Sequence, residues 1–214
     1  MREKKYFLLL VFITIGSYCQ IPNFEHNFTK KDTLENPLFE TFLKDYEFVI
    51  TYSDVCCSKQ YKILALKNGK WRSWTYSDNF IQWTKKNNES KITVDTIKLG
   101  TFFEGVNGKK VKENHIKKLL AKFSENDFWK LENDSLNQSR IIETYFEDGD
   151  TIKRKAIITD GTNYVFNIIT QKNSRKIQSY YPEYFIKLFP DMIDRKKFIK
   201  NRDYFLEWWK KYCH

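Results

Sequence analysis

The chain has 214 residues, a net charge of +10 and a hydrophobic share of 41%. This length is sufficient for one domain with a substantial buried core. The sequence contains no internal repeat and no low-complexity linker, and after residue 19 no apolar run is long enough to cross a membrane. These features argue against a repeat array and against a transmembrane segment in the mature chain.

The N-terminus predicts an export signal. The basic stretch MREKK precedes the apolar run YFLLLVFITIG, which is too short for a membrane anchor. Ser17 and Cys19 are small residues three and one positions before the expected cleavage site, so residues 1–19 are the signal peptide and Gln20 is the first mature residue. Bulky Tyr18 disfavours the lipoprotein alternative, in which Cys19 is lipidated.

This N-terminus, the cleavage before Gln20 and a mature chain rich in Lys, Asn, Ile and Phe but poor in Arg resemble the uncharacterised exported proteins of Bacteroidetes, of the flavobacterial type. The stretches YKILALKNGKW and SYYPEYF share this resemblance. The resemblance implies a periplasmic or secreted protein. It points to no characterised family and therefore carries over no catalytic or binding residue.

The mature chain remains basic. It keeps 34 of the 37 Lys and Arg residues and 26 of the 27 Asp and Glu residues, a net charge of +8. This charge favours an anionic envelope component as a partner, through an attraction that salt weakens, and another protein is the alternative partner. Because the Lys residues are scattered and form no block, we expect no specific nucleic-acid binding.

The first half of the mature chain predicts mainly strands. Polar residues 20–36 predict a flexible N-terminal arm, and NPLFETFLKDY predicts a short amphipathic segment at the start of a single domain over residues 37–214. EFVITYS predicts a strand, and YKILALKNGKWRSWTY predicts a hairpin that turns at Asn68-Gly69. KITVDTIKLGTFFEGVNGKKV adds one or two strands, whereas the pattern of residues 77–88 assigns no element.

The second half predicts a helix over residues 111–123, since its apolar residues repeat at steps of three and four. Residues 140–181 predict four strands of an antiparallel meander, with turns at Asp148-Gly149, Asp160-Gly161 and near Asn173.

Two further helices are predicted at the C-terminus. Pro182 suits the first turn of a short helix through Leu188. Asp194 is the expected N-cap of a final helix over 195–212, whose apolar stripe is Phe198, Phe205, Trp209 and Cys213. Trp208 is adjacent to Trp209, so one of these two is expected to lie off the buried stripe. The predicted fold is α+β, an antiparallel β-meander sheet with helices packed on one face and a C-terminal helix.

The cysteines predict a disulfide. Cys213 continues the apolar stripe of the last helix, and an exported protein folds in an oxidising compartment. We expect Cys213 to pair with one of the adjacent Cys56 and Cys57, because successive strand residues point to opposite faces and only one of the two can point inward. Cys57 is favoured, with Cys56 as the alternative.

Other uses of these cysteines are less favoured. A metal site would combine Cys56, Cys57, His115 and the terminal pair Cys213-His214, but adjacent ligands are unlike the usual spacing of structural zinc sites. A thiol redox centre usually has two residues between its cysteines. A Cys–His nucleophile would use His115, which lies in the charged stretch KENHIKK and is expected to be solvated.

An aromatic group with two adjacent cations is the candidate ligand-binding group. Aromatic rings stack on sugars or bases, and the cations suit an anionic ligand. Large aromatic residues on strands are more often core residues, so core packing is the competing interpretation. The group consists of Trp71, Trp74, Trp83, Lys70 and Arg72, with Tyr76 beside them.

The sequence contains no phosphate-binding glycine loop, no His-Glu-x-x-His and no Gly-x-Ser-x-Gly motif, and we expect neither a cofactor nor a metal. An exported noncatalytic binding or structural protein of the cell envelope is favoured, with the sheet face opposite the helices, or a sheet edge, open to a peptide or polymer. The alternative is an extracytoplasmic hydrolase of a polymer. An acidic pair such as Glu143 with Glu147 is of the kind that carboxylate hydrolases require, but on an alternating strand these two residues are expected to face solvent. Enzyme activity is left open, and no catalytic residue is assigned.

Overall fold

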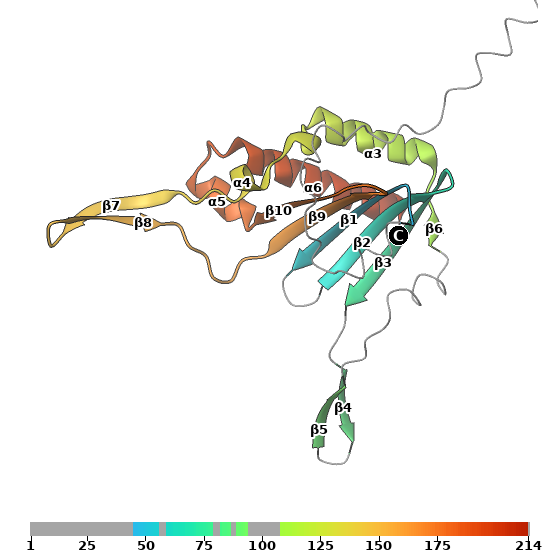
Figure 1. Cartoon of the computed structure of the whole chain (residues 1–214), viewed down its shortest axis with the longest axis horizontal. Helices are drawn as coiled ribbons and strands as arrows, with labels where there is room; N and C mark the ends of the chain where they lie inside the picture. The colour runs from blue at the N-terminus through green and yellow to red at the C-terminus, as the bar shows by residue number, and fades with distance from the viewer. Residues whose placement is uncertain (1–44, 56–58, 79–81, 87–88, 94–107, 214) are drawn as a thin grey trace, which may run out of the picture.

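The computed structural model describes residues 45–55, 59–78, 82–86, 89–93 and 108–213. Its main sheet has six antiparallel strands in the order β10-β9-β1-β2-β3-β6, and Figure 1 shows α3 and α6 along one face of it. The predicted α+β class, with helices on one face of an antiparallel sheet and a helix at the C-terminus, is confirmed. The signal, the arm and the amphipathic segment as far as residue 44 lie outside the described residues. The strands of the sheet are β1 (Phe48–Val55), β2 (Lys59–Lys67), β3 (Lys70–Asp78), β6 (Lys109–Lys110), β9 (Asn163–Thr170) and β10 (Ser174–Tyr180).

Two-residue turns set the register of two hairpins. Asn68 and Gly69, between β2 and β3, have φ angles of 51° and 68°. Asp148 and Gly149 have φ angles of 50° and 90° and join β7 (Ile141–Glu147) to β8 (Asp150–Lys155). Positive φ at both central residues matches the twist of the flanking strands, and Asn, Asp and Gly tolerate it best. Both predicted turns are therefore confirmed.

The four-stranded meander predicted over residues 140–181 is wrong. β7 and β8 form a two-stranded sheet of their own, whereas β9 pairs with β1 and β10. The sequences explain the difference. β9, NYVFNIIT, has a central run buried on both faces and can lie inside a sheet, whereas β8, DTIKRK, is polar at nearly every position and cannot. A second separate hairpin, β4 (Gln82–Lys86) with β5 (Glu89–Thr93), occupies part of the segment 77–88, to which the sequence assigned no element.

The predicted helices are present with small shifts of their ends. α3 (Glu113–Glu125) buries Ile116, Leu119, Leu120 and Phe123, which repeat at the predicted steps of three and four, and α5 spans Pro182–Leu188 as predicted. α6 (Ile193–Tyr212) begins two residues before the predicted start, so Asp194 lies in its first turn and Met192 is the N-cap. Two short elements between α3 and β7 were not predicted from the sequence, the 3-10 helix η1 (Phe128–Lys130) and α4 (Asn133–Leu136).

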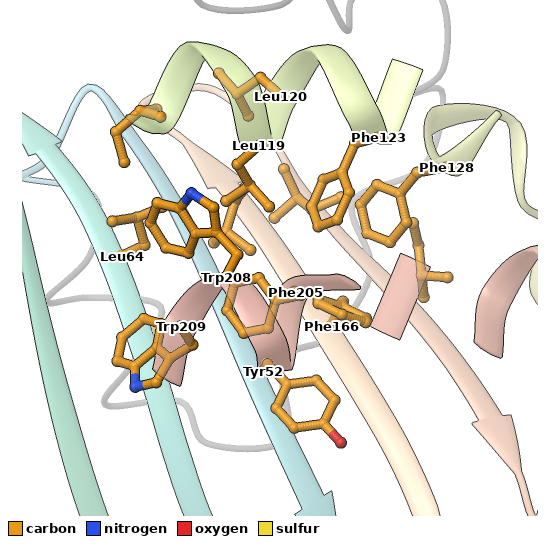
Figure 2. Packing of buried hydrophobic residues seen from close by; sticks show 14 of the residues in the cluster. Tyr52, Leu64, Leu119, Leu120, Phe123, Phe128, Phe166, Phe205, Trp208 and Trp209 are labelled. Atoms are coloured by element: carbon orange, nitrogen blue, oxygen red, sulfur yellow. The ribbon is translucent and has the colours of Figure 1, made fainter. Parts of the chain in front are cut away.

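An aromatic core lies between the sheet and the helices, as Figure 2 shows. Phe166 of β9 is at its centre, with ring centroids 5.0 Å from Tyr52 and 5.4 Å from Phe205. Both Trp208 and Trp209 are buried, so the expectation that one of them lies off the buried stripe is wrong. They follow Phe205 by three and four positions, and both positions lie on the same helix face as residue 205. The indole nitrogen of Trp208 donates to the carbonyl oxygen of His115 at 2.9 Å and so joins α6 to α3.

The sheet face opposite these helices is also buried. Val49, Ile63 and Val165 of β1, β2 and β9 point to this face and have no exposed surface. The polar pair Thr51 and Asn167 is buried among them, and the Asn167 amide donates to the Thr51 hydroxyl at 3.0 Å. The expectation that this face is open to a peptide or polymer is therefore wrong.

The free edge of β10 is covered by two asparagine side chains, one from α4 and one from the residue that follows it. The amide of Asn133 donates to the Lys176 carbonyl at 2.8 Å and accepts from the Gln178 N–H at 2.9 Å. Further along β10, the amide of Asn137 donates to the Gln178 carbonyl and accepts from the Tyr180 N–H. The two amides thus occupy the backbone groups that an additional strand would use, which protects this edge from pairing with another chain.

Replacement of Asn133 is expected to destabilise the domain. Asn133→Ala removes both bonds to β10 and should lower the free energy of unfolding by about 1 to 2 kcal/mol, whereas Asn133→Asp keeps the acceptor and should lose less. Chemical denaturation of both variants would measure this, with the exposed Asp134→Ala in the same helix as the control. Equal stability of Asn133→Ala and Asp134→Ala would contradict the assigned role of Asn133.

Within the described ranges, no helix is both long enough and apolar enough to cross a membrane.

Candidate interaction surface

The register of β3 separates the two buried tryptophans of the predicted ligand-binding group. Trp71 lies opposite Leu66 on the helix-covered face, where its ring meets that of Phe48 edge to face at 6.0 Å. Trp74 points to the other face and packs against Tyr46, with centroids 6.1 Å apart. They are only 4% and 6% exposed. Both tryptophans therefore pack in the core, as the competing interpretation predicts.

The remaining members of the group do not join them on one surface. Lys70 is exposed at the β2–β3 turn, and Arg72 is half-buried on the face that contains Trp74. The backbone of Trp83 lies in β4 opposite Ile92, in a separate two-stranded sheet, and its side chain is outside the described part of the structure. Ligand binding by these residues stays a prediction, and the geometry offers no shared stacking surface for Trp71 and Trp74.

Cys213 ends α6 in a half-buried position. Burial raises the pKa of its thiol, while the neighbouring Ser73 side chain and the charge of Lys109 act in the opposite direction. A thiol with a raised pKa is largely protonated at neutral pH and is a poor nucleophile. This environment does not favour the Cys–His nucleophile considered from the sequence.

Cys56 and Cys57 lie outside the described residues, so the disulfide stays a prediction. Val55, the last described residue before them, lies at the end of β1. It is five positions beyond Ile50, which is paired with Leu64 of β2, and Leu64 is paired in turn with Ser73 of β3. We expect peptide mapping of the nonreduced protein by mass spectrometry to find Cys213 linked to Cys57 or Cys56, with the third cysteine free. A Cys213 peptide recovered entirely as the free thiol from the exported protein would contradict the pairing.

The expectation that His115 is solvated is wrong. It is half-buried, and its ring stacks on Tyr212 with centroids 3.9 Å apart, since α3 and α6 pack side by side. Among the residues that the structure describes, no group of three His, Cys, Asp or Glu side chains is arranged to hold a metal ion. Of the other residues considered for a metal site, Cys213 is described, whereas Cys56, Cys57 and His214 lie outside the described residues.

The β7–β8 hairpin projects away from the sheet, as Figure 1 shows. Its backbone pairs run from Ile141 with Lys155 to Glu147 with Asp150, and a register irregularity lies at Ile142. Three large apolar side chains of β7 are exposed: Ile141 (46%), Ile142 (53%) and Phe146 (78%). Within the described part of the chain, neither strand belongs to another sheet. The hairpin therefore presents apolar side chains and backbone edges to its surroundings.

Charges are distributed unevenly along this hairpin. Its tip carries Glu147, Asp148 and Asp150, and its root carries Arg140, Lys153, Arg154 and Lys155. Arg140 is anchored to the body of the domain by an ion pair with Asp191 at 3.0 Å. The hairpin thus has an acidic tip and a basic root, with four charges of each sign between residues 140 and 155.

The acidic pair considered for hydrolysis lies on this hairpin. Glu143 and Glu147 are exposed and point to the same face of β7, but they are four positions apart, or about 13 Å along the strand. Glycosidase carboxylates that act together are separated by roughly 5 to 9.5 Å. Glu143 also pairs with Arg154 at 3.4 Å. This geometry does not favour a carboxylate pair that flanks a scissile bond.

The exposed hairpin, and not the predicted aromatic group, is therefore the candidate functional surface. The sequence of β8 indicates that this strand is exposed. Its polar residues occupy positions on both faces of the strand, so it cannot be buried inside a sheet. The interpretation depends on the geometry described above, because comparison of the chain with family models, with curated proteins and with solved structures finds no match.

Proposed function

We propose that this chain is an exported, noncatalytic protein-binding module of the cell envelope, and that the β7–β8 hairpin is its binding element. One observation carries the proposal: a two-stranded hairpin projects from the domain with Phe146 78% exposed. A two-stranded hairpin is marginally stable without further packing, so contact with a partner would stabilise it. Exposed strand edges bind other chains by strand addition, in which backbone hydrogen bonds supply affinity and side chains supply specificity.

The charge of the hairpin favours a protein partner over an anionic polymer. The mature chain is basic as a whole, but residues 140–155 carry equal numbers of acidic and basic side chains. The acidic residues at the tip would repel a polyanion. An anionic envelope component is more compatible with the net charge of the whole chain, and it remains the second partner class.

Export is part of the proposal and has its own test. The basic stretch and short apolar run support cleavage before Gln20 and release into the periplasm or the medium. N-terminal sequencing of protein recovered from its native host is expected to begin at Gln20. A mature form that begins at Met1 would contradict export by this signal.

A single substitution tests the binding element. Phe146→Thr keeps strand propensity but removes the most exposed apolar side chain, so capture of a specific envelope protein should fall while the stability of the domain stays within about 0.5 kcal/mol. Ile193→Thr, which changes another exposed apolar residue at the start of α6, is the matched control and should retain capture. Capture that resists Phe146→Thr but disappears in high salt would favour the anionic component. Turnover of a glycan, peptide or ester that is lost on replacement of one acidic residue, without unfolding, would favour the hydrolase instead.

A further inference from the structure

We infer that the partner of the hairpin is a second copy of this chain, and that the two copies join through their β7 edges in an antiparallel pair. The two hairpins then form one four-stranded sheet in the order β8-β7-β7-β8, around a two-fold axis. This inference rests on the proposed role of the hairpin as the binding element and names its partner.

The edges of β10 and β8 are protected against an additional strand. The Asn133 and Asn137 side chains already bond to the backbone of β10, as described above. β8 carries the consecutive cations Lys153, Arg154 and Lys155, and charged residues on an edge strand, Lys above all, oppose pairing with another strand.

β7 carries Glu143 and Glu147 but has no run of cations. The three large exposed apolar residues of the hairpin all lie on it, and it contains no Lys, Arg or Pro. In an antiparallel pair such as β7–β8, every second residue of each strand directs its N–H and C=O away from the partner strand. β7 therefore offers both unpaired backbone groups and apolar side chains along one edge.

The sequence of β7 is complementary to itself when it is reversed. With Thr144 opposite Thr144 of the second copy, Ile142 of each copy, the position of the register irregularity, lies opposite Phe146 of the other. Cross-strand pairs of an aromatic and a β-branched residue are among the favourable pairs in sheets. Because the axis is two-fold, the arrangement contains this pair twice and closes without an unpaired β7 edge.

The charges favour the same antiparallel direction. In this register Asp148 at the tip of one hairpin lies opposite Arg140 at the root of the other. Acidic tips thus lie beside basic roots at both ends of the sheet. A parallel arrangement would instead place tip beside tip and root beside root, and like charges that face each other are destabilising.

A contact made by the hairpins alone is small, so we expect a weak dimer whose population rises with protein concentration. Analytical ultracentrifugation of the purified protein should show a reversible monomer–dimer equilibrium. Phe146→Lys places a cation on the β7 edge and removes both Ile142–Phe146 pairs, so it should weaken the dimer about tenfold or more. A protein that stays monomeric at its highest soluble concentration would overturn the inference.

Cysteine cross-linking tests the register. Thr144→Cys places two thiols opposite each other at the two-fold axis and should give a disulfide-linked dimer under mild oxidation. Thr151→Cys is the matched control, because Thr151 is an exposed threonine of the same hairpin on the β8 strand and should give no more dimer than the wild type. Equal cross-linking of Thr144→Cys and Thr151→Cys would overturn the β7 pairing.

The outcomes separate this inference from the proposed function. If the protein is monomeric but Phe146→Thr abolishes capture of an envelope protein, the hairpin binds a different chain and only the second-copy inference fails. If Phe146 variants change neither self-association nor capture, the proposed function fails as well.

Discussion

Phe166→Ala is expected to lower the free energy of unfolding by about 3 to 5 kcal/mol, the usual cost of truncating a fully buried aromatic residue. The Phe166 ring has no exposed surface, and its centroid lies 5.0 Å from that of Tyr52 and 5.1 Å from that of Phe128. It also contacts aromatic rings of α3 and of α6, so its loss opens a cavity between the sheet and both helices. The surrounding rings come from different elements and cannot all collapse into that space.

Denaturant unfolding monitored by circular dichroism would measure this loss, with Phe146→Ala as the matched control. The two variants remove the same atoms from two strand residues, one fully buried and one largely exposed. The control should change stability by less than about 0.5 kcal/mol. Equal losses at the two positions would contradict the placement of Phe166 at the centre of the core.

Arg175→Met is expected to cost about 3 kcal/mol, because the Arg175 guanidinium holds the segment between α3 and β7 against the sheet. Arg175 is 5% exposed on β10 and donates to the carbonyl oxygen of Trp129 at 2.6 Å, to that of Leu131, and to the Glu132 carboxylate at 2.9 Å. Methionine fills similar space but cannot donate, so two backbone carbonyls that need partners lose them. The Glu132 ion pair contributes little, since Glu132 is largely exposed.

Glu132→Gln separates the contribution of the carbonyl bonds from that of the ion pair. It removes the charge of the partner but leaves both carbonyl bonds, and should therefore cost less than about 1 kcal/mol. Thermal or denaturant unfolding of the two variants gives the comparison. A larger loss for Glu132→Gln than for Arg175→Met would show that the ion pair, and not the carbonyl bonds, provides the stabilisation.

Phe166 and Arg175 also bear on the proposed function, because they hold in place the elements that protect the edge of the main sheet. Phe166 and Arg175 attach α3, η1 and α4 to β9 and β10. Asn133 of α4 and Asn137, the residue after it, in turn protect the β10 edge. The main sheet is thereby closed to added strands at β10. The exposed backbone edge of β7 lies on the projecting hairpin, away from the sheet that provides stability.

The sequence by itself determined the local elements. Period-two alternation placed β1, β2 and β3, the Asn68-Gly69 and Asp148-Gly149 turns placed two hairpins, and apolar spacing of three and four residues placed α3 and α6. These signals are local, because they depend on the backbone preferences and side-chain direction of neighbouring residues. The antiparallel α+β class followed from their order.

Only the tertiary structure decided how these elements combine. Alternation shows that a strand has two different faces, but the pairing of β9 with β1 across more than a hundred residues is set by the burial of both faces of β9. The same non-local packing buried Trp71 and Trp74 on opposite faces, made Trp208 and Trp209 both core residues, and left Phe146 exposed. Burial depends on which distant segment covers a side chain, and a pattern of neighbouring residues carries no information about that segment.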